Sequence, residues 1–236
     1  MNFTNFFKKL IPDNIFFLLK KRSILKKKYF GLNELDKKVS KYIDYDNGYF
    51  IELGANDGIS QSNTLYFEKF RNWRGILIEP VKFKFDQCLK SRDKNNLFYN
   101  YACVSSEFKH DHVELIYSNL RTVTSDKQNL IEAKNHIKSE DLNIYQSHKK
   151  LKVEAKTLNY ILKKSKAPKI IDFLSLDTEG YEIEVLKGVD FEEYFFKYIL
   201  VESKNFELIN NYLIKKNYEL LDKLSIHDYL YKKNEN

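Results

Sequence analysis

The chain has 236 residues, 43% of them hydrophobic and 31% charged, which suffices for one sizeable α/β domain and is short for two. Its two cysteines, Cys88 and Cys103, lie far apart, so neither a disulfide framework nor a zinc site is expected, and a reducing, cytoplasmic compartment fits. The net charge of +7 equals that of residues 1–30 alone, where eight lysines and arginines face one aspartate.

The N-terminal segment alternates apolar clusters with lysine clusters. Its longest apolar stretch, 15–19, is far too short to span a bilayer, and the pattern lacks the cleavage site of a signal peptide. We interpret residues 1–34 as a basic helical extension that packs on the domain or on a partner. Alternatively, residues 1–30 form a basic amphipathic segment that rests peripherally on an anionic membrane. Nucleic acid is not an expected partner, because the charge is confined to one terminus and lacks a recognised binding motif.

Strand and helix patterns alternate through residues 35–236, which we expect to form the main domain. Such alternation predicts a mostly parallel sheet with helices on both faces. The expected strands are 49–53, 75–78, 97–104, 170–176, 198–201 and an antiparallel last pair, 218–222 and 228–232. The expected helices are 35–43, 62–70, 82–92, 158–166 and one that begins at 182. Residues 106–150 have poor periodicity, which is typical of a substrate loop or lid.

A short apolar run at 49–53 ends in a turn that contains two of the chain's seven glycines, Gly54 and Gly58. Glycine tolerates positive φ and lets another group approach the backbone closely. A second strand then ends on Glu79, and an acid at that place in a doubly wound sheet binds a ribose diol. The two features together predict a site for a nucleoside-containing cofactor.

The residues of this turn distinguish between two cofactors. The dinucleotide fingerprint Gly-x-Gly-x-x-Gly is incomplete, because Asn56 stands at the second glycine position and Ile59 at the third. Glu52 and Asp57 make the turn acidic, and an acidic turn suits a ligand with an ammonium and a sulfonium better than one with phosphates. S-adenosylmethionine is therefore favoured over NAD.

Four motifs in this order resemble the FkbM family of S-adenosylmethionine-dependent methyltransferases. They are Glu-Leu-Gly-Ala-Asn-Asp-Gly at 52–58, Gln-Ser-Asn-Thr at 61–64, Ile-Glu-Pro at 78–80 and Phe-Leu-Ser-Leu-Asp-Thr-Glu-Gly-Tyr-Glu at 173–182. The resemblance runs from about Leu35 to about Lys232. It implies a Rossmann-like class I methyltransferase fold with a seven-stranded sheet. It also implies methyl transfer to a hydroxyl, often on a sugar or a polyketide.

The resemblance and the strand ends together define the expected cofactor site. Ser62 and Asn63 either cap a helix or, as the resemblance implies, contact the methionine end of the cofactor. Tyr101 and Ala102, at the end of the third strand, either contact the adenine or simply pack. The full set of expected cofactor contacts is Glu52, Gly54, Asn56, Asp57, Gly58, Ser62, Asn63, Glu79, Tyr101, Ala102 and Asp177.

Acids also end the two later strands of the sheet, Asp177 and Glu202. A sugar hydroxyl is a poor nucleophile, so its methylation needs a base or a metal ion. Asp177 is placed to be the base, or to bind Mg²⁺ together with Glu202; its alternative role is to cap the following helix. Glu179 and His227 are the alternative bases.

We therefore expect an S-adenosylmethionine-dependent O-methyltransferase that acts on a hydroxyl of a sugar, a glycan or a glycosylated small molecule. Two alternatives stay open at this point. One is an oxidoreductase that uses NAD or a nucleotide sugar on a similar fold. The other is a non-catalytic, membrane-associated scaffold.

Overall fold

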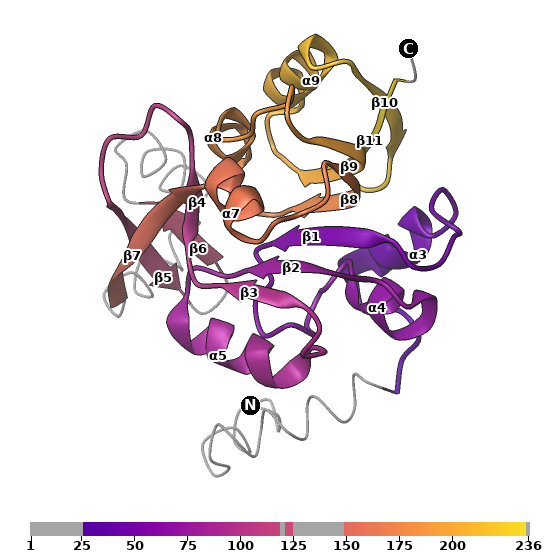
Figure 1. Cartoon of the computed structure of the whole chain (residues 1–236), viewed down its shortest axis with the longest axis horizontal. Helices are drawn as coiled ribbons and strands as arrows, with labels where there is room; N and C mark the ends of the chain where they lie inside the picture. Colours follow the sequence, from indigo (N-terminus) through magenta and orange to yellow (C-terminus); the bar gives the residue numbers. More distant parts are fainter. Residues whose placement is uncertain (1–25, 119–120, 125–148, 235–236) are drawn as a thin grey trace, which may run out of the picture.

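A central seven-stranded sheet lies beside a smaller four-stranded sheet in the computed structural model, which describes residues 26–118, 121–124 and 149–234 (Figure 1). The order of the central sheet is β10-β11-β9-β8-β1-β2-β3. Its strands are β1 (Tyr49–Leu53), β2 (Arg74–Ile78), β3 (Leu97–Tyr99), β8 (Ile170–Leu176), β9 (Phe195–Glu202), β10 (Tyr218–Lys223) and β11 (Asp228–Lys233).

The central sheet is parallel except at one end. β1 pairs in parallel with β2 on one side and with β8 on the other, so the chain order reverses at β1. β11 is inserted antiparallel between β9 and β10, which confirms the predicted antiparallel last pair. The predicted Rossmann-like fold class is confirmed. Ligands of such sheets bind beyond the carboxyl ends of the strands, next to the reversal.

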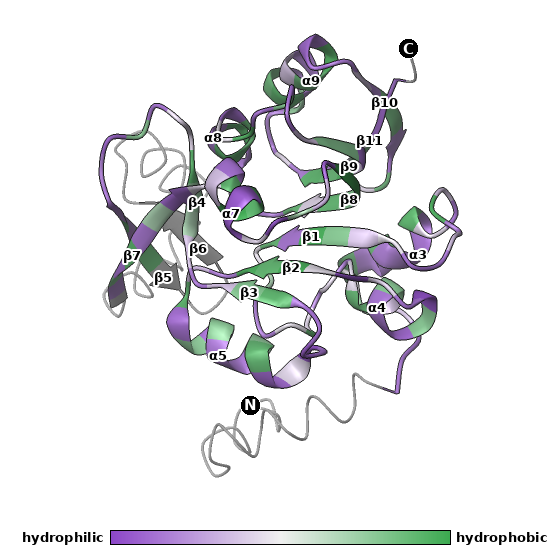
Figure 2. Ribbon diagram, in the orientation of Figure 1, coloured by the Kyte–Doolittle hydropathy of each residue, from purple (hydrophilic) through white to green (hydrophobic). Residues whose placement is uncertain are grey.

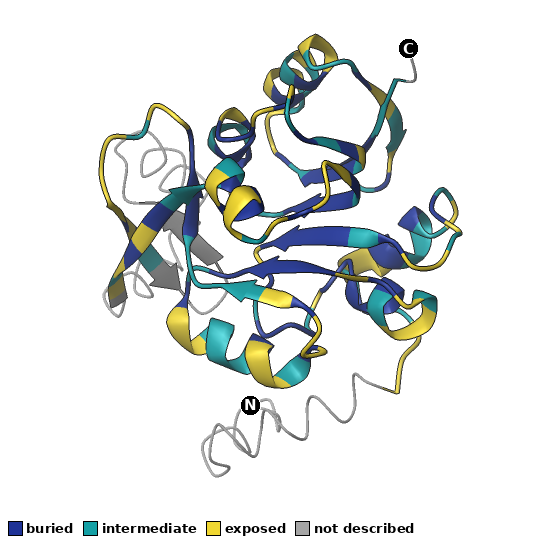
Figure 3. Cartoon of the chain, in the orientation of Figure 1, coloured by how far each residue is buried: buried dark blue, intermediate teal, exposed yellow. Residues whose placement is uncertain are grey.

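Two layers of helices cover the two faces of this sheet. Leu65 of α4 and Cys88 of α5 pack into the cluster on one face, whereas Leu158 of α7 and Ile209 of α9 pack into the cluster on the other. The helices are η1 (Leu32–Glu34), α3 (Leu35–Val39), α4 (Leu65–Arg71), α5 (Lys82–Ser91), α7 (Leu158–Lys164), α8 (Glu182–Lys187) and α9 (Phe206–Lys215). Figure 3 shows the central strands buried between these helices, and Figure 2 shows that the same strands are the most hydrophobic part of the molecule.

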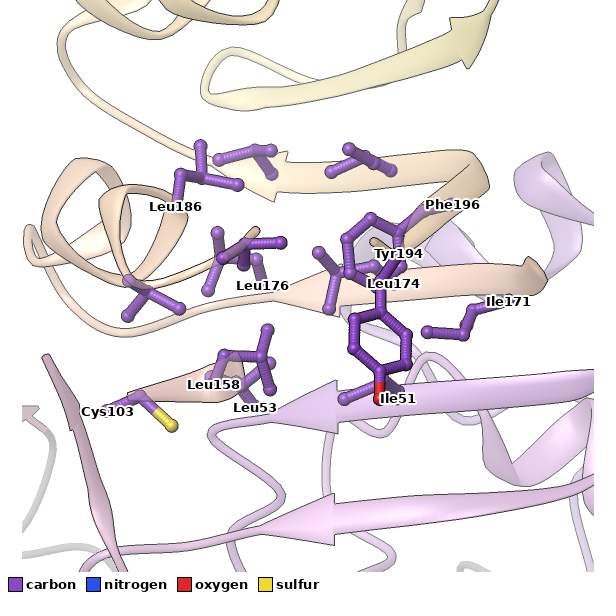
Figure 4. Close-up of a cluster of buried hydrophobic side chains, with 14 of the residues drawn as sticks. Ile51, Leu53, Cys103, Leu158, Ile171, Leu174, Leu176, Leu186, Tyr194 and Phe196 are labelled. Atoms are coloured by element: carbon purple, nitrogen blue, oxygen red, sulfur yellow. The ribbon is translucent and has the colours of Figure 1, made fainter. Parts of the chain in front are cut away.

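Alternation along β1 explains how one strand serves both layers. Ile51 and Leu53 point into the cluster beneath α7, α8 and α9, whereas Phe50 points to the other side. Figure 4 shows Leu53 next to Leu158 of α7 and below Leu176 of β8. Successive side chains of a strand point to opposite faces, so the continuously apolar strands predicted from the sequence are those buried on both sides.

The predicted third strand, 97–104, is divided between the two sheets. β3 ends at Tyr99 in the central sheet, and β4 (Ala102–Val104) pairs in parallel with β7 (Lys149–Thr157) in the smaller one. Asn100 marks the break: its Nδ2 donates to the carbonyl oxygens of Glu79 and Pro80, each at 2.8 Å. The prediction of one continuous strand was therefore wrong. After β2 ends, the carbonyl oxygens of Glu79 and Pro80 are bound by the Asn100 side chain rather than by the backbone of a paired strand.

The smaller sheet, of order β4-β7-β5-β6, lies beyond the carboxyl ends of β1, β2 and β8 (Figure 1). β5 (His112–Ser118) and β6 (Arg121–Thr124) lie in the segment that the sequence assigned to a loop or lid. Val113, Leu115 and Val153 are buried together inside this sheet, and Tyr181 of the β8–α8 loop packs against them. The rest of the expected lid, residues 119–120 and 125–148, lies outside the described residues.

Residues 29–31 of the expected N-terminal extension contact the domain. Phe30 is buried, and its N–H donates to Asp36 Oδ2 at 2.6 Å. Gly31 forms a parallel bridge with Gln61. Residues 1–25, which make up most of the extension, lie outside the described residues. Within the described part of the chain, every helix is too short or too polar to cross a bilayer.

Candidate active site

The turn after β1 touches the end of β8. Gly54 has φ +77°, and a Cβ there would lie 2.1 Å from the Asp177 carbonyl oxygen. Only glycine permits both this backbone conformation and this close approach. The contact joins the expected cofactor turn to the expected catalytic acid.

Most amide groups of this turn bind the protein itself. The N–H groups of Gly54 and Ala55 both donate to the Ile78 carbonyl oxygen at 3.1 Å. Asp57 is buried, and its Oδ1 accepts from the N–H of Ile59 at 3.0 Å and from that of Ser60 at 2.7 Å. Asp57 thus shapes the loop from within, and the turn differs from a phosphate-binding loop, which directs its amides at the ligand.

Glu52, the last acid of β1, is surrounded by hydrogen-bond donors. Its Oε1 accepts from the Asn63 N–H and from Ser62 Oγ, both at 2.9 Å. Its Oε2 accepts from Thr64 Oγ1 at 2.7 Å and from Arg92 Nη1 at 2.9 Å. The carboxylate therefore fixes segment 62–64 just before α4 begins.

Arg92 neutralises the negative charge of this network. Its side chain is 0% exposed, and its Nε donates to Glu68 Oε2 at 2.7 Å while Nη2 donates to Thr64 Oγ1 at 2.9 Å. A Cβ on Gly58 would lie 2.9 Å from Arg92 Cγ, so glycine lets the loop pass over the guanidinium. One buried cation between two carboxylates compensates charges that would otherwise be costly to bury.

Asn63 extends the same segment toward β8. Its Nδ2 donates to Ser175 Oγ at 3.1 Å. Its Oδ1 is buried without a hydrogen-bond partner among the described residues. A buried acceptor without a donor costs free energy; this one lies against Gly31, where a Cβ would be 2.8 Å away from it.

Glu79 and Asn56 face each other across the ends of β2 and β1. Glu79 Oε2 accepts from the Asn56 N–H and Oε1 from the Val81 N–H, both at 2.8 Å. Burial raises the pKa of Glu79 to about 7, against the lowering effect of these two amides. Asn56 Oδ1 is buried and lacks a partner in the described part of the chain. A carboxylate has about four acceptor positions, so Glu79 can still accept the two hydroxyls of a ribose.

Tyr101 and Ala102 lie where the chain leaves the central sheet. Ala102 is buried and pairs with Ala155 of β7. The Tyr101 ring stacks on that of Tyr99 at 5.9 Å, and its hydroxyl accepts from Lys164 Nζ at 3.0 Å. Both residues thus follow directly on the β2–β3 end that carries Glu79.

Asp177 and Glu202 form an acid pair at the ends of the neighbouring strands β8 and β9. Their side chains are partly buried and hydrogen-bonded to each other. Burial, together with the charges of Glu202, Glu179 and Glu182, raises the pKa of Asp177 well above its ordinary value. Adjacent carboxylates resist simultaneous ionisation, so the charge of Glu202 adds to the upward shift of the Asp177 pKa.

The β8–α8 loop is held by a buried acid. Glu182 Oε1 accepts from the N–H groups of Thr178 and Gly180, at 3.1 and 2.9 Å. Glu179 and Gly180 have φ values of +54° and +99°. Glu179 itself is exposed. The tight loop therefore places Glu179 outside and keeps the backbone of Asp177 against Gly54.

His227 lies at the same edge, in the turn between β10 and β11. Its side chain is exposed, and its carbonyl oxygen accepts from the Ser203 N–H at 2.8 Å. Asp228 is the register partner of Glu202. The structure therefore brings all four expected reactive groups to one edge: Asp177, Glu179, Glu202 and His227.

The expected magnesium site finds no support. Within the described ranges, His, Cys, Asp and Glu side chains nowhere gather in a group of three or more that could hold a metal ion. Asp177 and Glu202 supply only two such groups.

The sequence from 52 to 231 matches the Methyltransferase FkbM domain family. The chain belongs to the FkbM methyltransferase family. This membership carries a methyltransferase assignment, and it disfavours the hydride-transfer alternative. The match spans Glu52, Glu79, Asp177 and Glu202, the strand-end acids of the site.

Several solved structures resemble the fold. A Pyrococcus horikoshii protein described as an RNA methyltransferase has a TM-score of 0.42 and 12% identity, covering 85% of this chain and 80% of that one. A fibrillarin/Nop5p complex gives 0.42 and 10%, covering 79% and 72%. A methyltransferase from Pyrococcus furiosus gives 0.38 and 14%, covering 83% and 82%. No curated protein sequence matches the chain.

Three residues with clear roles at this edge escaped the sequence analysis. Arg92 stands in a polar stretch, Ser-Arg-Asp-Lys, that resembles any solvated turn. Ser175 is buried inside an apolar strand, and Glu182 was read only as the start of a helix. A buried polar residue within a strand was a usable signal for Ser175, because such groups require a partner; Arg92 offered none.

Proposed function

We propose that this methyltransferase uses S-adenosylmethionine to methylate a hydroxyl of a sugar or glycan. The observation that carries the proposal is the contact between Gly54 and the backbone carbonyl of Asp177. This contact brings the turn expected to hold the cofactor next to the strand end that carries Asp177 and its neighbour Glu202.

The proposed cofactor residues fit the chemistry of S-adenosylmethionine. Glu79 would accept the ribose hydroxyls, and the Oδ1 atom of Asn56, which has no partner among the described residues, would accept from a donor group of the ligand. Gly54 and Gly58 keep the turn free of side chains, and Asp57 and Glu52 hold its shape. Tyr101 and Ala102 would border the adenine. When bound, the cofactor supplies a methyl group on a positively charged sulfur, which this acidic edge favours electrostatically.

The acid pair would manage the acceptor's proton. Asp177, in its ionised form, would accept the proton from the acceptor hydroxyl at a carboxylate oxygen. The neighbouring Glu202 would favour uptake of that proton, because it raises the pKa of Asp177. Glu179 and His227 are the exposed groups at the same edge and remain the alternative bases. General-base catalysis of this kind contributes roughly two to four decades of rate.

The smaller sheet would bound the acceptor. It lies beyond the carboxyl ends of the central strands and contacts the catalytic loop through Tyr181 (Figure 1). Hydroxyl-rich acceptors are recognised by a few precisely placed polar groups. We therefore propose that segment 106–150 helps to bind the acceptor. Its described part does so as strands of the smaller sheet rather than as a loop.

Thermal shift of the full chain with three ligands tests the cofactor. S-adenosylmethionine and S-adenosylhomocysteine should raise the melting temperature, and NAD should not, because a ligand stabilises only a fold that binds it. Transfer of labelled methyl from S-adenosylmethionine to a panel of glycans then tests the acceptor. Stabilisation without transfer to any glycan would indicate that the acceptor is a different hydroxyl compound. Absence of stabilisation by either sulfur ligand would leave the scaffold alternative.

A further inference from the structure

The surface over α4 and the segment 26–37 combines exposed apolar side chains with lysines. Leu32 and Phe70 are each 49% exposed. The Phe70 ring lies 5.6 Å from that of Tyr66, which stacks on Tyr29 at 4.9 Å. We call the exposed surface above Tyr66 the aromatic–lysine face: Lys26, Lys27, Lys28, Tyr29, Leu32, Lys37, Lys69 and Phe70.

Lysine ammonium groups lie directly over the rings of this face. Lys28 Nζ and Lys37 Nζ are 5.5 and 5.7 Å from the Tyr29 ring centre. Lys69 Nζ is 5.8 Å from the Phe70 ring centre. The alkyl stems of lysine can cover apolar surface while the charged ends reach into a polar layer.

The outward charge of the face is positive. Segments 26–37 and 65–71 contain six basic and three acidic residues. Two of the acids turn inward: Asp36 accepts from the Phe30 N–H at 2.6 Å, and Glu68 pairs with Arg92 at 2.7 Å. Glu34 is the acid of this set that is left to solvent, and it pairs with Lys37.

The N-terminal segment that precedes this face in the sequence is also rich in basic and apolar residues. Residues 1–25 contain five of the eight basic residues of the N-terminus against Asp13 alone, together with the apolar cluster at 15–19. They join the folded domain at Lys26, at the border of the face. The basic and apolar character of the terminus therefore continues on the surface of the domain.

We propose that the aromatic–lysine face docks on an anionic lipid surface. Lysines near such a surface are attracted within a Debye length, and apolar side chains enter the boundary between headgroups and acyl chains. A protein partner fits less well, because lysine is depleted from the centres of protein interfaces. The bridge between Gly31 and Gln61 ties this face to the loop that carries Ser62 and Asn63.

Vesicle binding by the full chain tests the proposal. The probes are vesicles of phosphatidylcholine alone and vesicles with about 30% phosphatidylglycerol, the anionic component. The chain should bind the anionic vesicles, and salt should weaken binding because it screens charge. The double variant Leu32→Ser/Phe70→Ser should bind about tenfold or more weakly, since two partly exposed apolar side chains no longer enter the lipid.

Ile214→Ser is the matched control, because Ile214 is 55% exposed on α9, across the sheet from α4. It should bind like the wild type, and all variants should keep the wild-type melting temperature. If the double variant fails to fold, Lys28→Glu/Lys69→Glu replaces it and should lose the salt-dependent binding. The proposal is overturned if the wild type ignores anionic vesicles, or if the folded variants of this face bind as well as the control.

Discussion

Acids lie at two places along the carboxyl ends of the central strands: one at the ends of β1 and β2, the other at the ends of β8 and β9. Their surroundings differ. At the β1–β2 end, Glu52 is buried among four donors and neutralised by Arg92. At the β8–β9 end, Asp177 and Glu202 contact each other, and Glu179 and Glu182 add further negative charge. The donors around Glu52 compensate its charge and fix the backbone of segment 62–64, whereas burial and the neighbouring carboxylates raise the pKa of Asp177.

The difference shows that the position of an acid at a strand end does not by itself determine its chemical role. An acid at a strand end is visible in the sequence, but its partners decide its role. A carboxylate saturated with donors holds a loop in place, whereas one crowded by other carboxylates holds a proton that can move. We therefore propose that the β1–β2 end places the cofactor and that the β8–β9 end takes part in proton transfer.

The substitution Asp177→Asn should have the largest effect. It removes the charge of the proposed base while keeping the shape of the side chain, so methyl transfer should fall by roughly two to four decades. Binding of S-adenosylhomocysteine should persist. The measurement is single-turnover transfer of labelled methyl beside calorimetry on the same sample. Glu179→Gln is the control; a loss with that variant instead would make Glu179 the base.

Arg92→Leu should cost the most stability. It leaves Glu52 and Glu68 buried without their cation, and breaking such a buried pair costs roughly 3–5 kcal/mol. Urea unfolding of Arg92→Leu and of Arg74→Leu, whose side chain is exposed, makes the comparison. Equal stability of the two variants would show that the network at the β1–β2 end is not a structural anchor.

A pair of glycine variants tests the contact between the two ends. Gly54→Ala adds both an unfavourable φ and a clash with the Asp177 carbonyl, whereas a Cβ on Gly180, at φ +99°, meets no atom within 4 Å. Backbone strain alone costs about 1–3 kcal/mol, so Gly180→Ala should lose that amount and Gly54→Ala clearly more. Thermal and urea unfolding measure both. Equal losses would mean that the close approach is easily relaxed.

Glu79 should make cofactor affinity depend on pH. Because its pKa is raised to about 7, Glu79 is mostly protonated below that pH, and the charged acceptor forms as pH rises through it. Affinity for S-adenosylhomocysteine should therefore rise with pH, by up to about one to two decades, the worth of a charged hydrogen bond. Calorimetry on wild type and Glu79→Gln across this range checks it; a variant with the same pH dependence would exclude Glu79.

The central sheet could be predicted because its strands carry strong signals. Runs such as 170–176 are apolar throughout, and Gly54 and Gly58 mark the turn. The smaller sheet was missed although part of its signal was present: Leu151, Val153 and Ala155 alternate with charged residues, which indicates a strand with one buried face. The frequent charged residues of segment 106–150 obscured this two-residue alternation.

The expected site residues came from strand ends, and their grouping follows from topology. What the sequence could not show is which acid meets which partner. Arg92 reaches Glu52 across 40 positions, and Asn63 reaches Ser175 across 112. Such pairings depend on packing between distant elements rather than on local pattern, so the contrast between the two ends of the edge needed the structure.

Calorimetric titration of the full chain with S-adenosylhomocysteine, at a pH above that at which Glu79 ionises, tests the central claim most directly. We expect one ligand per chain, an affinity reduced by about one to two decades in Glu79→Ala, and an unchanged affinity in Asp177→Asn. Absence of binding by the folded wild type would contradict the proposed cofactor. Equal weakening by both variants would contradict the division of the edge into a cofactor end and a proton-transfer end.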